Sequence, residues 1–137
     1  MRETHTIQVQ MPDREIGALA VEVFEDPSCK LVVRGLGLIS REFHGEDLFE
    51  ALIGLRIALE RMGCRLLCAG ARADVYPSGM ARDLGSARKA YILRIGFPGV
   101  DLIDIFTSAA PELIGTVEEQ QKFYDKWMQN FHNGRAT

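Results

Sequence analysis

The sequence predicts an α+β fold in a single domain, residues 1–137, with one layer of mostly antiparallel sheet covered by two helices. Short runs that alternate between apolar and polar residues are separated by turn signals, as in an antiparallel meander. Two other segments carry apolar residues at helical spacing. The chain has 137 residues, 47% hydrophobic and 26% charged, which is enough for one globular core and unlike a disordered or fibrous protein.

Three strands are expected at the start of the predicted order β-β-β-α-β-β-β-α. Residues 4–11 alternate strictly between polar and apolar side chains, which is typical of a half-buried strand. Further strands are expected over 18–24 and 30–38, since Pro12 and the Asp26-Pro27 pair mark turns before them. These short turns favour antiparallel pairing of neighbouring strands.

The first helix is the clearest element of the chain. It is expected to open at residues 44–47, and an apolar stripe then follows at spacings of four and three: Leu48, Leu52, Leu55, Leu59 and Met62. Gly63 stands where a left-handed residue commonly ends a helix. The pattern therefore predicts a helix that buries one face against the sheet.

The second half of the chain is expected to add three strands and a helix. The strands are predicted over 64–68, 90–95 and 100–106. Thr116 and Glu119 have the spacing of a capping box, which predicts a helix start. That helix carries a large apolar and aromatic face, made of Val117, Tyr124, Trp127, Met128 and Phe131, which is expected to dock on the sheet.

Residues 69–88 show no sustained period and are rich in glycine and alanine, which predicts a long ordered loop. Apolar residues within it are expected to anchor the loop on the sheet: Val75, Tyr76, Met80 and Leu84. The loop belongs to a basic stretch, since residues 63–95 hold six basic and two acidic side chains, a balance of +4 within a chain of net charge −3. Loops of this length are usually functional.

Four interpretations of this basic segment remain open. Arginine and backbone amide groups favour anions, so the segment could hold a phosphate, a nucleotide or another small anionic ligand through Arg72, Arg82, Arg88 and Lys89. Arg72 and Arg82 could instead pair with Asp74 and Asp83 and stiffen the loop. The segment could also contact another protein. Catalysis has the weakest basis: Pro77-Ser78-Gly79 reads as a turn rather than a nucleophile elbow, and Asp74, Asp83 and Tyr76 form no clear titratable pair.

Acidic side chains gather in two places in the first half of the chain. Glu22, Glu25 and Asp26 belong to the region of the first hairpins, and Glu46 and Asp47 precede the first helix. Such residues usually form a solvated face. They could also attract a basic partner, such as a nucleic-acid-cleaving protein, and so form a secondary binding surface.

The cysteines and histidines predict no metal site and no cofactor. Cys29, Cys64 and Cys68 are an odd number of thiols, expected to be reduced and buried in the core, and the three histidines are widely spaced. The first ten residues lack the apolar core of a signal peptide, and no apolar stretch is long enough to span a membrane. These features predict a cytoplasmic protein without a membrane partner.

Residues 67–91 resemble a small family of bacterial single-domain proteins, through Gly-Ala-Arg-x-Asp-Val-Tyr-Pro-Ser-Gly-Met-x-Arg-Asp-x-Gly followed by Arg-Lys-Ala-Tyr. The stretch from Ala109 to Gln120 extends the likeness, and Gly85-Ser86-Ala87 departs from it where the family has glycines. These proteins are similar to the immunity proteins encoded beside polymorphic or Rhs-type toxins.

The resemblance implies a non-enzymatic protein that binds a cognate toxin domain and occludes its active site or substrate path. It carries over no catalytic residue, and it implies a protein partner rather than direct contact with nucleic acid. We expect the main contact surface in residues 69–88, through Tyr76, Met80, Arg82, Asp83 and Arg88, with the acidic residues second. The sequence leaves the oligomeric state open.

Overall fold

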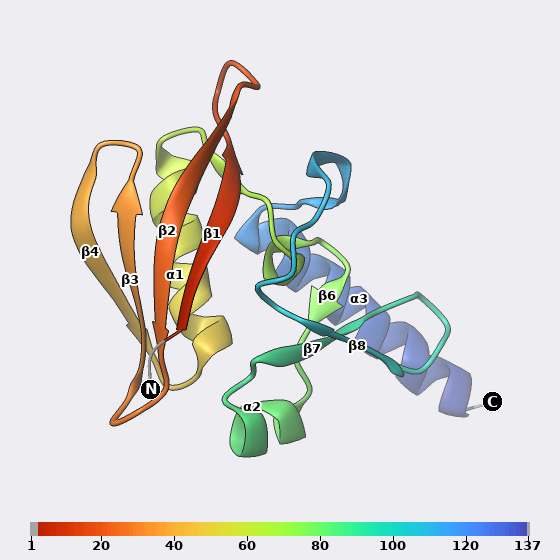
Figure 1. The fold of residues 1–137 in the computed structure, drawn as a ribbon. Helices are drawn as coiled ribbons and strands as arrows, with labels where there is room; N and C mark the ends of the chain where they lie inside the picture. The colour runs from red at the N-terminus through yellow and green to blue at the C-terminus, as the bar shows by residue number, and fades with distance from the viewer. Residues whose placement is uncertain (1–2, 137) are drawn as a thin grey trace.

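The computed structural model describes residues 3–136 and confirms the α+β class (Figure 1). The elements follow in the order β1 (Glu3–Gln10), β2 (Ile16–Phe24), β3 (Cys29–Gly35), β4 (Leu38–Gly45), α1 (Leu48–Arg61), β5 (Arg65–Leu66), β6 (Val75–Tyr76), α2 (Gly79–Gly85), β7 (Lys89–Ile92), β8 (Asp101–Asp104) and α3 (Val117–Ala136). Single 3₁₀ turns lie at Ala69–Ala71 and Pro111–Leu113. Within residues 3–136, no helix is long and apolar enough to cross a membrane.

The first half forms the expected antiparallel meander, closed by a short fifth strand in the order β4-β3-β2-β1-β5. Alternate side chains of the long strands point to one face and are fully buried, including Val9, Leu19, Val21, Leu31 and Val33. Helix α1 packs behind this face (Figure 1). The opposite face of the sheet is left to solvent, which explains the strict alternation seen in the sequence.

The strands divide between two sheets, which corrects the expected single layer. Strand β5 pairs with β1 through only Val9–Leu66 and Gln10–Arg65, and the chain then turns away at the buried 3₁₀ turn Ala69–Ala71. Strands β6, β7 and β8 form a separate three-stranded antiparallel sheet. The strands β4 and β6 and the helix α2 were not predicted.

Both ends of α1 have the chemistry that the sequence predicts. The Asp47 carboxylate accepts the backbone N–H of Glu50 at 2.7 Å and caps the helix start. At the other end Gly63 has φ of 76°, and the Cys64 and Gly63 amides donate to the carbonyls of Leu59 and Glu60. This is a Schellman motif, which favours glycine because the left-handed backbone strains other residues.

Helix α3 begins at the predicted capping box. The Glu119 amide donates to Thr116 Oγ1 at 3.0 Å, and the Thr116 amide donates to Glu119 Oε1 at 2.8 Å. The hydrogen bond from the Thr116 amide lowers the pKa of the Glu119 carboxyl, and the Thr116 side chain adds to this. Tyr124 and Trp127 are half-buried beside the small sheet, as expected of the aromatic face, whereas the side chain of Phe131 lies outside the described residues.

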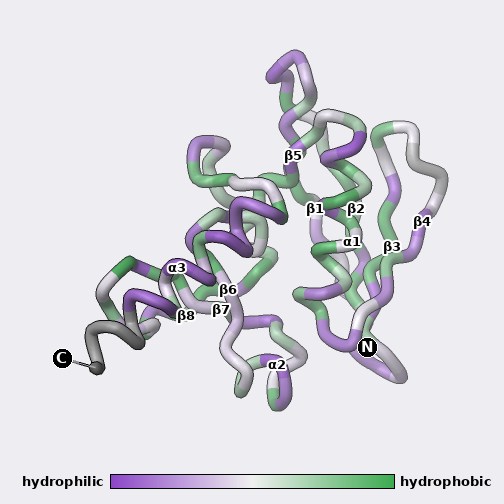
Figure 2. Tube along the Cα trace, turned by 180° about the vertical axis from the view of Figure 1, so that it is seen from behind, coloured by the Kyte–Doolittle hydropathy of each residue, from purple (hydrophilic) through white to green (hydrophobic). Residues whose placement is uncertain are grey.

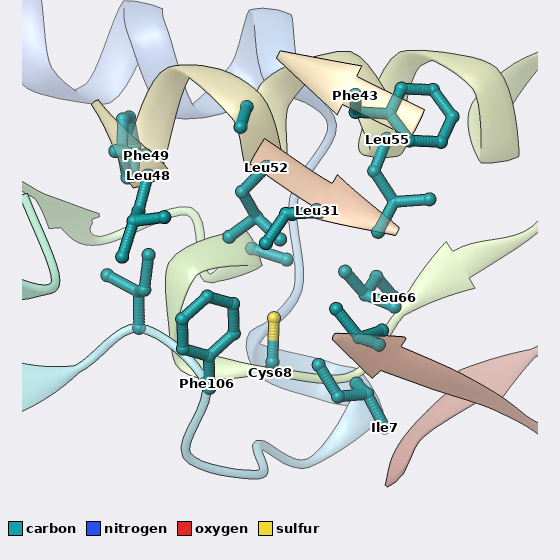
Figure 3. Close-up of a cluster of buried hydrophobic side chains, with 14 of the residues drawn as sticks. Ile7, Leu31, Phe43, Leu48, Phe49, Leu52, Leu55, Leu66, Cys68 and Phe106 are labelled. Atoms are coloured by element: carbon teal, nitrogen blue, oxygen red, sulfur yellow. The ribbon is translucent and has the colours of Figure 1, made fainter. Parts of the chain in front are cut away.

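One hydrophobic cluster joins the two halves of the chain. In Figure 3, Phe106 and Cys68 from the second half lie against Ile7 of β1 and Leu52 of α1. All three cysteines are free and buried, as predicted. Burial raises the pKa of the Cys68 thiol to about 12, so this sulfur is a packed, protonated side chain.

A buried polar network, which the sequence analysis missed, fastens α1 to the second half. Arg56 is 2% exposed, and its guanidinium donates to Gln120 Oε1 at 2.6 Å and to the carbonyls of Gly115 and Gly70 at 3.0 and 3.3 Å. Gln120 in turn donates to the carbonyls of Gly70 and Arg72. Desolvation lowers the pKa of Arg56, because none of these acceptors carries a formal charge.

Candidate protein-interaction surface

Residues 69–88 are not a loop. They contain a 3₁₀ turn, β6 and α2, and the helix is capped by Ser78, whose hydroxyl oxygen accepts the Ala81 amide at 3.0 Å. The helix ends in two residues with left-handed backbone, Ser86 and Ala87. A seven-residue helix and a two-residue strand are too short to produce a hydrophobic period, which is why the sequence reads as irregular.

The three arginines of this segment lie in separate ion pairs. Arg72 binds both carboxylate oxygens of Asp74 at 2.8 Å, the only one of these pairs that stays within the segment. Arg82 binds Asp47 at 2.8 Å. Arg88 binds Glu3 and, at 3.0 Å, Asp104. Because these guanidinium groups are directed at three different carboxylate sites, they do not converge on a common space for a small anion.

The pair of Arg82 and Asp47 fixes α2 to the start of α1. The carboxylate is buried and already caps α1, and the guanidinium lies over the rings of Phe49 and Tyr76 at 5.3 and 5.5 Å. The Leu48 amide also donates to the Ser86 carbonyl at 2.8 Å, at the far end of α2. Arg82 and Asp47 therefore position the helix. Arg82 is half-buried and Asp47 is buried.

Tyr76, also expected at the contact surface, joins the small sheet to α3. Its ring stacks on Tyr124 with centroids 3.9 Å apart, and its hydroxyl donates to Gln121 Oε1 at 3.0 Å. Its edge meets Phe49 at 5.3 Å. Burial and the neighbouring Tyr76 raise the pKa of Tyr124. The contacts of Tyr76 are thus largely internal.

Arg88 links the two sheets, since Glu3 lies on β1 and Asp104 on β8. The hydrogen bond from Arg88 is the main reason that the pKa of Glu3 falls from its usual 4.5 to about 2. His5 adds to this, since its ring nitrogen lies 2.6 Å from Glu3. Arg88 is therefore a structural tie between the sheets.

The lowered pKa of Glu3 predicts a pH dependence of stability. A carboxyl with a folded pKa below its unfolded value stabilises the protein above about pH 4.5, and this contribution is lost as the pH falls toward 2. Solvent screens Glu3, whose side chain is 40% exposed. We therefore expect the carboxyl to contribute about 1 kcal/mol or less to the free energy of unfolding. Urea unfolding at pH 7 and pH 3 should show a smaller pH effect in Glu3→Gln than in the wild type. The surface variant Glu118→Gln is the control, and equal pH effects in both variants would contradict the prediction.

Two of the predicted contact residues, Met80 and Asp83, remain exposed, and Leu84, which was not among them, is exposed beside them on α2, at one end of the molecule. Met80 and Leu84 lie one turn apart on α2 and are 71% and 82% exposed, with Asp83 between them. The expectation that Met80 and Leu84 anchor the segment on the core is therefore wrong, whereas Val75 is buried. Figure 2 shows hydrophobic and hydrophilic residues side by side on α2.

Acidic side chains flank α2 at this end. Glu25 and Asp26 occupy the β2–β3 turn and Glu46 precedes α1, all of them exposed. The turn and α2 lie at the same end of the molecule (Figure 1), since Cys29 pairs with Gly45 and its thiol contacts Ser86. We call the exposed set of Glu25, Asp26, Glu46, Met80, Asp83 and Leu84 the α2 corner. Glu22 is not part of it, because it lies on the outer face of the large sheet, 3.3 Å from Arg34.

A second group of exposed apolar residues was not singled out from the sequence. Val100 and Leu102 are 71% and 57% exposed, and Phe97 is also exposed, all on the β7–β8 hairpin. Alternation over residues 100–106 suggested a half-buried strand, but Val100 and Leu102 stay exposed, whereas Leu93, beside Tyr124 and Trp127 of α3, is buried. The exposed apolar surface therefore runs from α2 onto the small sheet.

The described part of the chain holds no group of three or more histidine, cysteine, aspartate or glutamate side chains that could bind a metal ion. Comparison with known proteins adds no identification: the sequence matches no model of a protein family, and no curated protein is significantly similar to it.

Proposed function

We propose that this chain is a non-enzymatic protein-binding inhibitor of the immunity type, which binds a cognate bacterial toxin domain in the cytoplasm and blocks its active site or substrate path. The observation that carries the proposal is the exposure of Met80 and Leu84 on a helix held in place by Arg82 and Asp47. The resemblance of residues 67–91 to immunity proteins supports the same function.

Large apolar side chains exposed on a fixed element favour contact with a macromolecule. Water contact with such side chains is unfavourable, so a contiguous exposed group commonly marks an interaction site. A helix already held by an ion pair and by the Leu48–Ser86 hydrogen bond loses little conformational freedom on binding. The α2 corner therefore has the composition and the rigidity of an interface centre.

The charge of the α2 corner favours a basic partner. Four exposed carboxylates lie at the same end of the molecule as the two apolar side chains: Glu25, Asp26, Glu46 and Asp83. Carboxylates at the rim of an interface raise the association rate with a positively charged protein and select against acidic ones. A toxin domain that acts on nucleic acid presents such a basic surface, so the acidic rim would face the groove that normally receives phosphates.

The contact residues expected from the sequence then take two roles in this proposal. Met80 and Asp83 contact the toxin directly, together with Glu25, Asp26 and Glu46. Tyr76, Arg82, Arg88 and Asp47 act through their internal contacts, which hold α2 and the small sheet in position.

The proposal predicts that Leu84→Asp abolishes protection against the toxin. A charged side chain at the centre of an apolar interface is expected to cost at least about 2 kcal/mol of binding, a roughly 30-fold increase in Kd. The measurement is growth of bacteria that co-express the chain with the toxin domain encoded beside it, together with calorimetric titration of the two purified proteins.

Ile16→Asp is the matched control, because Ile16 is also an exposed apolar residue, at 49%, but begins β2, at the opposite end from the β2–β3 turn. It should protect as well as the wild type. Absence of protection by the wild-type chain would overturn the proposed function. Equal protection by both variants would show that the interface with the toxin does not include the α2 corner.

A further inference from the structure

Two apolar grooves adjoin on the outer face of the small sheet. The first, about 320 Å³, lies between α2 and the β7–β8 strands, with Leu84, Lys89 and Leu102 in its lining. The second, about 270 Å³, lies between the hairpin and α3, with Leu93, Tyr124 and Trp127 in its lining. Tyr91 and Ser78 line both grooves. The two hollows therefore adjoin at these side chains, and we call the pair of them the β7 groove.

The register of the small sheet explains why this face is open. Tyr91 lies opposite Leu102, and Ala90 lies opposite Ile103. Because side chains alternate along a strand, Ala90 and Ile103 point to the core while Tyr91 and Leu102 point away from it. The β7 groove thus lies on the outer face of the small sheet, between α2 and α3, where Leu102 stays exposed and Leu93 is buried.

The aromatic walls of the groove are held in position by their own contacts. The Trp127 indole N–H donates to the Phe97 carbonyl at 2.8 Å, which ties α3 to the turn of the hairpin. Tyr124 stacks on Tyr76 on one side and faces Trp127 on the other, with centroids 6.2 Å apart. Walls that are ordered before binding reduce the entropic cost of receiving a ligand.

Shape and charge together define what fits the β7 groove. Two adjoining apolar hollows match an extended peptide segment, whose side chains enter them in succession. Among the residues lining either hollow, Lys89 is the one charged side chain, and it has no ion pair in the described part of the chain. An unpaired cation beside an apolar surface is complementary to a carboxylate next to apolar side chains.

We propose that the β7 groove binds an extended apolar segment of the partner protein that carries a carboxylate at its Lys89 end. The proposed function supplies the identity of that protein, whereas the binding itself follows from the groove alone. The segment would place its apolar side chains against Tyr91, Leu102 and Trp127. The α2 corner and the β7 groove share Met80 and Leu84, so they form adjoining parts of one contact with the same toxin. Its acidic part is the α2 corner, and its part beside Lys89 receives the acidic, apolar segment.

The test uses four acetylated, amidated pentapeptides, each with Leu-Phe-Pro-Leu and either glutamate or lysine at the first or the last position. The chain has one tryptophan, so the emission of Trp127 reports occupation of the groove directly. We expect one glutamate peptide to change this emission with a Kd at least fivefold below that of its lysine counterpart. Lys89→Glu should reverse the preference, because it reverses the charge that selects the peptide.

Two further variants separate binding from folding. Leu102→Asp should abolish the response to every peptide while the circular dichroism spectrum stays that of the wild type, since Leu102 is exposed. Lys30→Glu, on the outer face of the large sheet, should leave the preference unchanged. Retention of the glutamate preference in Lys89→Glu would overturn the proposal.

The remaining outcomes also decide the question. No change in Trp127 emission at about 1 mM peptide, or equal affinity for the glutamate and lysine peptides, would overturn the proposal. So would sedimentation equilibrium showing a dimer that Leu102→Asp dissociates, because a second copy would then occupy the groove. None of these measurements uses the toxin, so a failure here leaves the growth assay as the separate test of the proposed function.

Discussion

Replacement of Arg56 by methionine is expected to lower the free energy of unfolding by about 3–5 kcal/mol. Methionine fills part of the space but donates no hydrogen bond. The Gly115 carbonyl and Gln120 Oε1 would then be buried without the donor they now have. Each unsatisfied buried group costs about 1–3 kcal/mol, and the lost packing of the long side chain adds to this. Urea unfolding followed by circular dichroism measures the difference.

A matched substitution and a second variant test the cause. Arg61→Met makes the same change at an exposed position of the same helix and should cost less than about 0.5 kcal/mol. In the double variant Arg56→Met with Gln120→Leu, the loss should be smaller than the sum of the single losses, because the two side chains satisfy each other. Additive losses would show that the network acts only through packing.

Arg82→Met is expected to cost about 2–3 kcal/mol of stability and to loosen α2. The substitution leaves the buried Asp47 carboxylate with its cap to the Glu50 amide but without its cation. Helix α2 would keep the Leu48–Ser86 hydrogen bond and would lose the ion pair that fixes its middle. A seven-residue helix has little stability of its own, so the loss should be local as well as global.

Hydrogen exchange distinguishes the local effect from the global one. The Arg82 amide, which donates to the Ser78 carbonyl within α2, should exchange faster in the variant than global unfolding alone explains. Asp83→Asn is the control, because Asp83 is exposed and adjacent to Arg82. Unchanged exchange in α2 would show that Arg82 does not hold the helix, and the proposed α2 corner would lose its physical basis.

Local patterns were sufficient for about half of the fold. The stripe from Leu48 to Leu59, the Gly63 cap and the Thr116–Glu119 capping box each depend on residues within a few positions of one another, and each was confirmed. Met62, predicted as the end of the stripe, lies beyond α1 and is 42% exposed, so that part of the prediction was wrong. The meander of the first three strands follows from alternation and short turns in the same way. Such features can be predicted from the sequence because they depend on interactions between residues close together in the chain.

Strand β4 was not predicted from the sequence because it is an edge strand. It pairs with β3 on one side only. Among residues 40–44, Phe43 is buried and the other four residues are exposed. One buried residue produces no alternation to detect. Its existence depends on β3 having a free edge, which is a property of the sheet rather than of residues 38–45.

The candidate site shows the same division between local and tertiary information. The sequence by itself identified residues 69–88 as unusual and basic and marked Met80 and Asp83 as contact candidates. Only the tertiary structure decided that Arg82 and Arg88 pair with carboxylates 35 and 85 positions away, that Arg56 is buried against Gln120, and that Met80 and Leu84 face solvent. Helical and strand periodicity depends on near neighbours. Whether a charge is paired and whether an apolar side chain is covered depend instead on which distant segments pack beside it.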